Sequence, residues 1–143
     1  MKATPEAVWA LVSDVTRTGE FSPETFEAQW TRGSTGPSVG AYFKGHVNRN
    51  NRGVKYWTLC KVTDCEPGKV FAFDVLMNGE RVVNSWRYEM EPAGDGTDVT
   101  ESFRLDQNLG TRIYWLLLGW ARGKTNREGM RTTLNRIKAV VEA

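Results

Sequence analysis

The sequence predicts an α+β fold, in which helices gather on one face of an antiparallel β-sheet. Three observations support this prediction. The chain opens with a helical pattern, continues with β-type segments between tight turns, and returns to a helical pattern after Gly110. Asn78-Gly79 and Asp95-Gly96 are dipeptides typical of hairpins, so the strands on either side of each should run antiparallel. Helices, then a run of strands, then a helix is an order that favours α+β over alternating α/β folds.

The first element is expected to be a helix from about Pro5 to Ser13. Thr4 is a good N-cap, and proline fits the first helical position because its missing N–H is not needed there. Apolar side chains then recur at helical spacing. A second short helix or turn is expected at about 15–20, and Pro23 prevents a smooth continuation beyond it.

The middle of the chain is predicted to form six strands. Its segments are rich in aromatic and β-branched residues, and short turns separate the last four of them, at 67–68, 78–79 and 95–96. The predicted strands lie near 25–31, 41–48, 53–65, 69–76, 81–91 and 97–106.

If each of these turns is a two-residue loop, its register assigns every side chain of the last four strands to one face of the sheet. On this register Phe73 pairs with Asn84, and Glu101 pairs with Met90. One face is then apolar and aromatic, and the other is polar. We therefore expect the apolar face to enclose a core or a cavity.

The last section of the chain is expected to be a long helix with a bend near Gly119 and Gly123. Its apolar residues form one stripe, as a helix packed against a sheet requires. The residues of this stripe are Met130, Leu134, Ile137 and Val141.

Length and composition restrict the class of protein. A chain of 143 residues fits a single domain, 1–143. A net charge of +2 is too small to indicate nucleic-acid binding. The apolar run at 113–120 is far shorter than the ~20 residues of a membrane-spanning helix, and no signal peptide is visible.

The two cysteines indicate a reduced protein. Cys60 and Cys65 are five residues apart in one predicted strand, so they should point to opposite faces and stay unbridged. We therefore expect a reduced, cytoplasmic protein.

Six segments carry a family resemblance, in the order TPEAVWALVSD (4–14), GEFSPE (19–24), GPSVGAYFKG (36–45), EPGKVFAFDV (66–75), WRYEMEPAGDGTDVTESF (86–103) and GMRTTLNRIKAVVE (129–142). The sequence resembles the polyketide cyclase/dehydrase-like branch of the START-related, birch-pollen-allergen-like superfamily (SRPBCC), most of all its small actinobacterial proteins. The resemblance covers nearly the whole chain. Each motif alone is weak, and their order and spacing make the resemblance specific.

The resemblance implies a helix-grip fold, in which a curved antiparallel sheet wraps around a long C-terminal helix and encloses a hydrophobic cavity. Members bind lipids, polyketides, hormones or sterols, and some catalyse cyclisation or dehydration, so the fold does not imply one reaction. The family usually has a strand of about ten residues before the first helix, and here only residues 1–3 precede it. We expect a start assigned too late, a sheet edge shortened or covered locally, or edge pairing in a homodimer, because an unpaired edge is a liability.

Glu101 is the leading candidate for chemistry, because its register places a carboxylate on the apolar face. Burial raises the pKa of such a group, which suits a general acid or base or a hydrogen bond to a ligand. Tyr56 and Tyr88 are its candidate partners in proton transfer. The alternative is that Glu101 lies at the mouth of a cavity or pairs with an arginine.

Other side chains of the apolar face are expected to line a ligand pocket. Convergent polar groups among aromatic rings are typical of such pockets, and the alternative is an ordinary core with satisfied hydrogen bonds. The expected ligand-binding residues are Phe43, Tyr56, Thr58, Cys60, Phe71, Phe73, Asn84, Trp86, Tyr88, Glu101 and Phe103 from the sheet, with Trp115, Met130 and Leu134 from the helical side.

Metal and cofactor chemistry is not expected. The sequence has no HExxH or CxxC motif and no His/Asp cluster, and the single histidine, His46, is expected on the outer face of the sheet. The basic residues at 112–131 are either a solvated face or a contact with anionic lipid headgroups.

These observations favour a protein that binds a small hydrophobic molecule, such as a lipid, polyketide or aromatic metabolite, as a carrier or sensor. The first alternative is a cyclase or dehydratase that works without metal and uses Glu101 with a cavity tyrosine. The second is a module that binds a partner and no ligand. A cavity below a few hundred Å³ would favour this second alternative, since ligand pockets usually measure ~300–1,000 Å³.

Overall fold

The computed structural model describes residues 1–48, 55–77, 80–105 and 127–143. Helix α1 (Pro5–Ser13) and the short 3₁₀ helix η1 (Val15–Glu20) precede the strands, and a C-terminal helix is described over 127–141. The strands are β1 (Thr25–Thr31), β2 (Tyr42–Val47), β3 (Tyr56–Glu66), β4 (Val70–Met77), β5 (Arg81–Ala93) and β6 (Gly96–Leu105).

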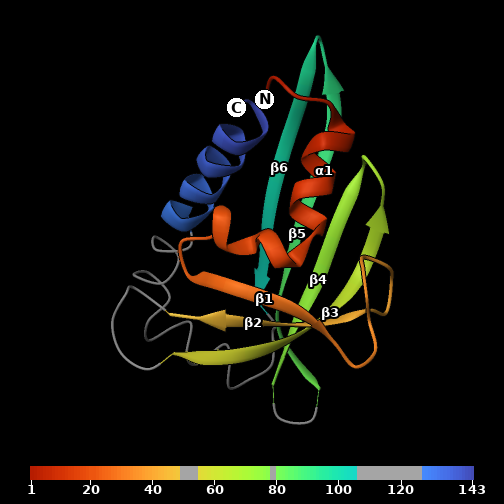
Figure 1. The fold of residues 1–143 in the computed structure, drawn as a ribbon, viewed down its shortest axis with the longest axis vertical. Helices are drawn as coiled ribbons and strands as arrows, with labels where there is room; N and C mark the ends of the chain where they lie inside the picture. Colours follow the sequence, from red (N-terminus) through yellow and green to blue (C-terminus); the bar gives the residue numbers. More distant parts are fainter. Residues whose placement is uncertain (49–54, 78–79, 106–126) are drawn as a thin grey trace.

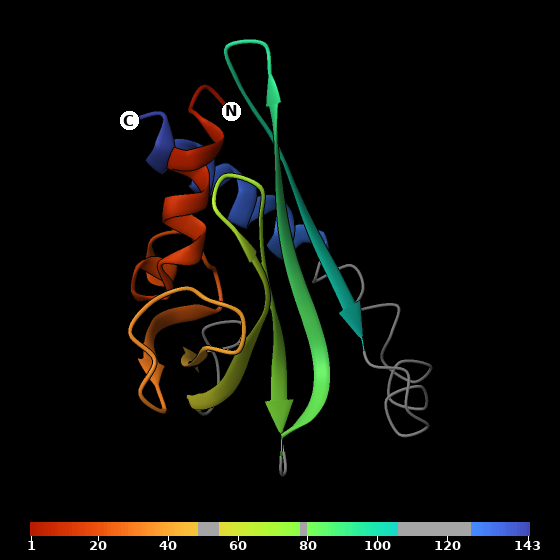
Figure 2. The same ribbon diagram turned by 90° about the vertical axis from the view of Figure 1, so that its right-hand side faces the viewer.

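The strands form one antiparallel sheet in the order β1-β2-β3-β4-β5-β6, so the predicted meander is confirmed. The sheet is strongly curved: β1 and β2 run across the lower part of Figure 1, whereas β4–β6 run along its length. Helix α1 and the C-terminal helix lie on the same side of β4–β6 (Figure 2). This arrangement confirms the predicted α+β, helix-grip fold.

Helix α1 forms where the sequence predicts it and covers one end of the sheet. The Thr4 side chain accepts a hydrogen bond from the Ala7 N–H at 3.1 Å, which caps the helix. Val8 and Leu11 are fully buried on its inner side. The Trp9 indole donates a hydrogen bond of 2.9 Å to the Val70 carbonyl on β4, which fixes the helix against the sheet.

The first three residues lie against β6 at Thr97. The Met1 amino group donates to the Thr97 carbonyl at 2.7 Å, and the Thr97 N–H donates to the Met1 carbonyl at 2.8 Å. The Thr97 hydroxyl donates to the Ala3 carbonyl at 2.6 Å. A Cβ on Gly96 would lie 2.1 Å from the Met1 carbonyl oxygen, so this close approach requires glycine. One end of the β6 edge is therefore covered locally, whereas pairing of sheet edges in a dimer stays a prediction.

From Val75 and Asn84 away from the turn, the predicted faces of β4 and β5 are right, but the predicted pairs are wrong. Phe73 pairs with Trp86, and Val75 pairs with Asn84. The strands pair from Met77 and Arg81 onward, which leaves three residues between them rather than two, and a bulge near Val75 adds one more residue. Two added residues restore the side-chain alternation, because its period is two.

The β5–β6 pairing is also offset by two residues. Ala93 pairs with Gly96, so the loop is Gly94-Asp95, with φ 57° at Gly94, rather than Asp95-Gly96. Glycine adopts positive φ at little cost, and this favours its place inside the turn. The offset keeps Glu101 on the inner face but places it opposite Tyr88, not Met90.

A second bulge overturns the prediction for the cysteines. The β3–β4 register shifts between Val62 and Asp64, so Cys65 pairs with Phe71 on the inner face, as Cys60 pairs with Val75. The two thiols therefore share a face. Both are free.

The outer face of β1–β3 carries His46, as predicted. Its ring stacks on Trp57 at a centroid distance of 4.1 Å, and its Nδ1 lies 2.8 Å from a carboxylate oxygen of Glu27. These contacts account for the histidine without placing it in the cavity described below.

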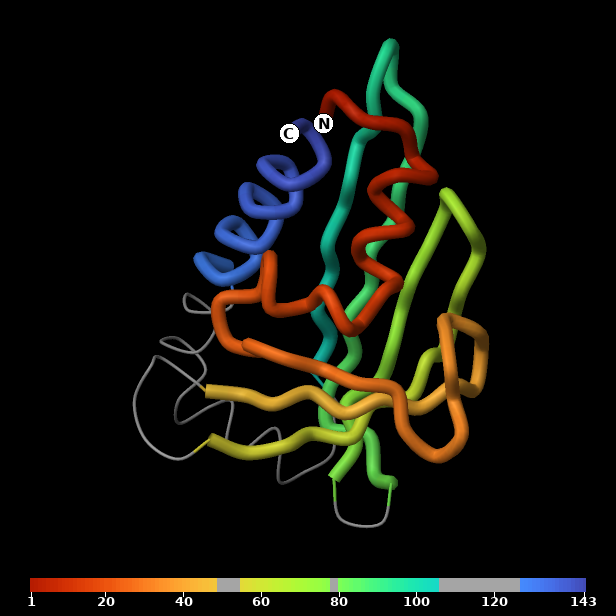
Figure 3. The backbone as a smooth tube through the Cα atoms, viewed as in Figure 1, coloured from red at the N-terminus to blue at the C-terminus, as the bar shows by residue number. Residues whose placement is uncertain are grey.

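The C-terminal helix packs into the concave side of the sheet. Ile137 is fully buried, whereas Met130 and Leu134 of the predicted stripe are half-buried. The two chain ends lie close together (Figure 3), and the Lys2 N–H donates to the Glu142 side chain at 2.6 Å. No helix in the described ranges is long and apolar enough to cross a membrane.

Candidate functional site

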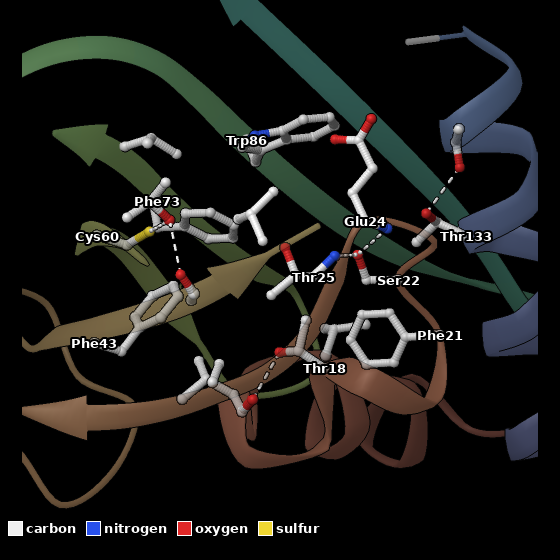
Figure 4. A pocket seen from close by; sticks show the side chains of 18 of the residues that line it. Thr18, Phe21, Ser22, Glu24, Thr25, Phe43, Cys60, Phe73, Trp86 and Thr133 are labelled. Carbon is white, nitrogen blue, oxygen red and sulfur yellow. Dashed lines mark hydrogen bonds between the residues drawn. The ribbon is translucent and has the colours of Figure 1, made fainter. Parts of the chain in front are cut away.

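A cavity of about 180 Å³ lies between the concave face of the sheet, the α1–η1 region and the C-terminal helix. Figure 4 shows its interior, with Phe43, Phe73 and Trp86 entering from the sheet and Thr133 from the helix. The curvature of the sheet brings strands β2 to β6 around one space, so their inner side chains converge.

Most of the predicted pocket residues surround this cavity. The eleven from the sheet all line it: Phe43, Tyr56, Thr58, Cys60, Phe71, Phe73, Asn84, Trp86, Tyr88, Glu101 and Phe103.

The residues predicted to line the cavity from the C-terminal helix are not the ones that the structure places there. Met130 and Leu134 do not line the cavity, because the helix turns Gly129 and Thr133 toward it instead. A residue one position away along a helix points about 100° away, so this small error in phase changes the lining residues. Trp115 lies outside the described residues.

The sequence also left part of the cavity wall unassigned. Helical spacing could have indicated Val12, but Ser22 and Glu24 lie in a loop without a periodic pattern. The Ser22 hydroxyl accepts a hydrogen bond from the Thr25 N–H at 3.0 Å, which shapes this loop. Figure 4 shows the Glu24 side chain pointing into the cavity toward Trp86. The further lining residues include Val15, Thr18, Phe21, Pro23, Thr25 and Ala28.

Aromatic rings form much of the wall. Phe43 and Phe73 meet edge to face with centroids 5.1 Å apart, and Trp86 meets Phe103 at 4.7 Å. These pairs follow the register, since Trp86 and Phe103 are directly paired across β5 and β6. Such geometry stabilises this part of the wall beyond the burial of area.

Glu101 and Tyr88 form a polar pair inside this apolar surround. The Tyr88 hydroxyl donates a hydrogen bond of 3.1 Å to Glu101 Oε1, as their direct pairing across β5 and β6 allows. Burial raises the pKa of Glu101 to about 7, although the hydrogen bond from Tyr88 opposes this change. Burial, and then the nearby carboxylate, raise the pKa of Tyr88 well above its usual value. No ion pair joins Glu101 to a lysine or arginine among the described residues.

Two buried oxygens of the cavity wall accept no hydrogen bond from any described group: Glu101 Oε2 and Asn84 Oδ1. Thr58 differs, since its hydroxyl lies 3.4 Å from the Gly45 carbonyl. A buried polar atom without a partner costs free energy. The two oxygens are therefore the points where a bound molecule would gain most from hydrogen bonding.

Tyr56 lines the cavity but does not join Glu101 and Tyr88. Glu101 lies in one row with Tyr88, Phe71 and Cys65 across the sheet. Tyr56 is nine residues from Cys65 along β3, a path of about 30 Å at ~3.3 Å per residue. Tyr56 therefore lies in a different row of the sheet from the pair, and its part in proton transfer stays a prediction.

Cys60 is expected to react slowly with alkylating reagents in the folded protein. Burial raises the pKa of its thiol to about 12, which lowers its thiolate fraction at pH 8 roughly a thousandfold. Cys65 is less buried, so iodoacetamide should modify it at least ~100 times faster. Peptide mapping by mass spectrometry measures both rates in one sample. In urea the two rates should become similar, and equal rates in the native protein would contradict the burial of Cys60.

A curved antiparallel sheet that holds a C-terminal helix over an internal cavity defines the helix-grip class of folds. Within it, residues 1–142 match the family described as polyketide cyclase/dehydrase and lipid transport, and the chain belongs to this family. The resemblance predicted from the six sequence segments is thereby confirmed.

Solved structures agree with this assignment. A polyketide-cyclase-like protein from Corynebacterium glutamicum is 34% identical, with 99% of this chain and 80% of that chain covered and a TM-score of 0.53. A protein from Nitrosomonas europaea, 15% identical, has a TM-score of 0.71 over 99% of this chain and 89% of its own. One from Mycobacterium smegmatis, 16% identical, has a TM-score of 0.65 over 99% and 86%. The last two show the fold alone. No curated protein is significantly similar to the chain in sequence.

Proposed function

We propose that the chain binds a small hydrophobic molecule in its internal cavity, as a carrier or a sensor. The observation that carries this proposal is the aromatic-lined cavity. Eleven residues predicted from the sequence line it, and two of its buried oxygens accept no hydrogen bond from any group in the described part of the chain. An apolar wall with few convergent polar groups is the usual construction of a ligand site. The family's description as polyketide cyclase/dehydrase and lipid transport agrees with it.

Native mass spectrometry of the purified protein tests this proposal directly. A co-purified molecule should appear as an added mass that is lost on denaturation. If no molecule co-purifies, a thermal-shift assay against a panel of lipids, polyketides and aromatic metabolites is the second test. A ligand that binds only the folded state raises the Tm. If no added mass appears and no compound of the panel raises the Tm, ligand binding is excluded as the function.

A cyclase or dehydratase is the second candidate, and the Glu101–Tyr88 pair favours it. A carboxyl group with a pKa of about 7 exists in both protonation states at neutral pH, which suits proton transfer. In a dehydration, the Glu101 carboxylate would take a proton from the carbon next to a carbonyl. The protonated acid would then return that proton to the leaving hydroxyl, which departs as water. Tyr88 would hold the carboxyl group in position through its hydrogen bond.

A partner-binding module without a ligand is the third candidate, because the cavity of about 180 Å³ is smaller than the usual ~300–1,000 Å³ of ligand pockets. This candidate predicts that no small molecule raises the Tm, which the same thermal-shift panel measures. A homodimer through the sheet edge is a separate prediction, compatible with each of these candidates, and size exclusion with light scattering tests it.

A further inference from the structure

The cavity that the described residues form is small, and its volume favours a small ligand. An engineered cavity of about 150 Å³ lined by apolar side chains binds benzene, and the cavity here measures about 180 Å³. A space of this size fits one substituted aromatic ring closely. The edge-to-face pairs Phe43–Phe73 and Trp86–Phe103 offer ring faces and edges for such a molecule to pack against.

The polar atoms of the cavity wall determine which hydrogen-bonding groups a ligand needs. Glu101 Oε1 already accepts from Tyr88, so Oε2 is the oxygen that remains for a bound molecule. An ionised carboxylate needs a hydrogen-bond donor there, whereas a protonated one offers its own O–H and needs an acceptor. A hydroxyl group can do both, so it suits Glu101 in either protonation state.

The charge of Glu101 also disfavours anionic ligands. A ligand carboxylate placed against Oε2 would put two like charges together in an apolar surround, which disfavours ionisation of both. No lysine, arginine or histidine is found among the described residues of the cavity wall to offset this repulsion. An uncharged ligand is therefore favoured over an anionic one such as a fatty acid.

We infer that the cavity takes a compact, uncharged aromatic molecule of about one ring that bears a hydroxyl group, and that this hydroxyl bonds to Glu101. Asn84 lies four residues along β5 from Tyr88, about 13 Å away at ~3.3 Å per residue. It can receive a second polar substituent from the opposite end of the ligand, and its amide can turn over to offer either its oxygen or its nitrogen. This inference rests on the proposed function, since both concern the same cavity.

Three probes with one apolar body and different head groups test the inference: 4-propylphenol, propylbenzene and 4-propylbenzoate. Titration calorimetry at pH 6 and pH 8 should show 4-propylphenol binding at least about tenfold tighter than propylbenzene at both values, with 4-propylbenzoate weakest. One hydrogen bond to a buried polar atom that otherwise lacks a partner accounts for a difference of this size in either protonation state. Hexadecanol should bind more weakly than 4-propylphenol because its chain exceeds the cavity.

Substitutions at Glu101 and Asn84 test which of the two residues bonds to the hydroxyl of 4-propylphenol. Glu101→Leu should reduce the preference for 4-propylphenol over propylbenzene to less than about twofold and leave propylbenzene binding in place. Glu101→Gln, which can still hydrogen-bond, should keep most of the preference. Asn84→Leu should lower 4-propylphenol affinity less than about threefold. Circular dichroism and urea unfolding verify that each variant is folded.

The outcomes separate this inference from the proposed function. Equal affinity for 4-propylphenol and propylbenzene, or a preference lost in Asn84→Leu and kept in Glu101→Leu, would overturn the hydroxyl assignment and leave hydrophobic binding in place. Tight binding of hexadecanol with no binding of the ring probes would overturn both the size limit and the aromatic ligand, and would leave hydrophobic binding in place. Failure of all four probes, of the ligand panel and of native mass spectrometry would overturn both.

Discussion

Replacing Ile137 with alanine is expected to lower the free energy of unfolding by about 2–5 kcal/mol, the range measured for such truncations in protein cores. Ile137 is fully buried and belongs to the same core cluster as Val8, Phe71 and Tyr88. Its removal leaves a cavity between the C-terminal helix and the sheet, because the surrounding structure relaxes only in part. Urea unfolding followed by circular dichroism measures the loss.

Two further variants make this prediction specific. Ile137→Val removes one methyl group and should cost about 0.5–1.5 kcal/mol. Asn135→Ala, at an exposed position of the same helix, should change the stability by less than about 0.5 kcal/mol. Similar losses of unfolding free energy for Ile137→Ala and Asn135→Ala would show that this helix does not pack against the sheet.

Replacing Glu101 with glutamine is expected to make the protein less sensitive to pH between about 4.5 and 7. The pKa of Glu101 is about 7 in the folded protein and 4.5 at its ordinary value, because burial disfavours the charged form. Below pH 4.5 the group is protonated in both states. As the pH rises to 7, the unfolded chain releases the proton while the folded protein retains it, so stability falls and then levels off above pH 7.

The gap between the two pKa values corresponds to about 3 kcal/mol of unfolding free energy. Glutamine keeps the acceptor for Tyr88 and removes the titration. The stability of Glu101→Gln relative to the wild type should therefore increase by up to about 3 kcal/mol from pH 4.5 to pH 8, measured by urea unfolding at several pH values.

Glu91→Gln is the matched control, because Glu91 lies on the neighbouring strand β5 and is exposed. Its effect on stability should stay nearly constant over the same pH range. A pH dependence in Glu101→Gln equal to that of the wild type would show that Glu101 ionises as freely in the folded protein as in the unfolded chain.

The sequence predicted the inner face of the sheet more reliably than the pairing of individual residues. Side-chain alternation is local, so Phe73, Trp86 and Glu101 were assigned to the correct face. Loop length and bulges depend on backbone conformation, which residue types specify only weakly. The two-residue offset at β5–β6 is the result, and it places Tyr88 rather than Met90 beside Glu101.

The same reasoning explains the error for the cysteines. Five residues of regular strand would separate Cys60 and Cys65 onto opposite faces, but the bulge between Val62 and Asp64 adds one residue and reverses the alternation. Nothing in this stretch of sequence marks a bulge. Pro23 ended the helical pattern as predicted, yet the loop that directs Glu24 into the cavity had no sequence signal.

By itself, the sequence determined the α+β class, the order of the strands, the limits of α1 and the apolar face of the sheet. These depend on local alternation, helical spacing, capping and turn residues, which neighbouring positions specify together. Only the tertiary structure decided that Tyr88 bonds to Glu101, and that the C-terminal helix presents Thr133 to a cavity of about 180 Å³. The reason is physical: cavity shape and cross-strand pairs depend on the register, bulges and curvature of the whole sheet, to which each residue contributes only a small part.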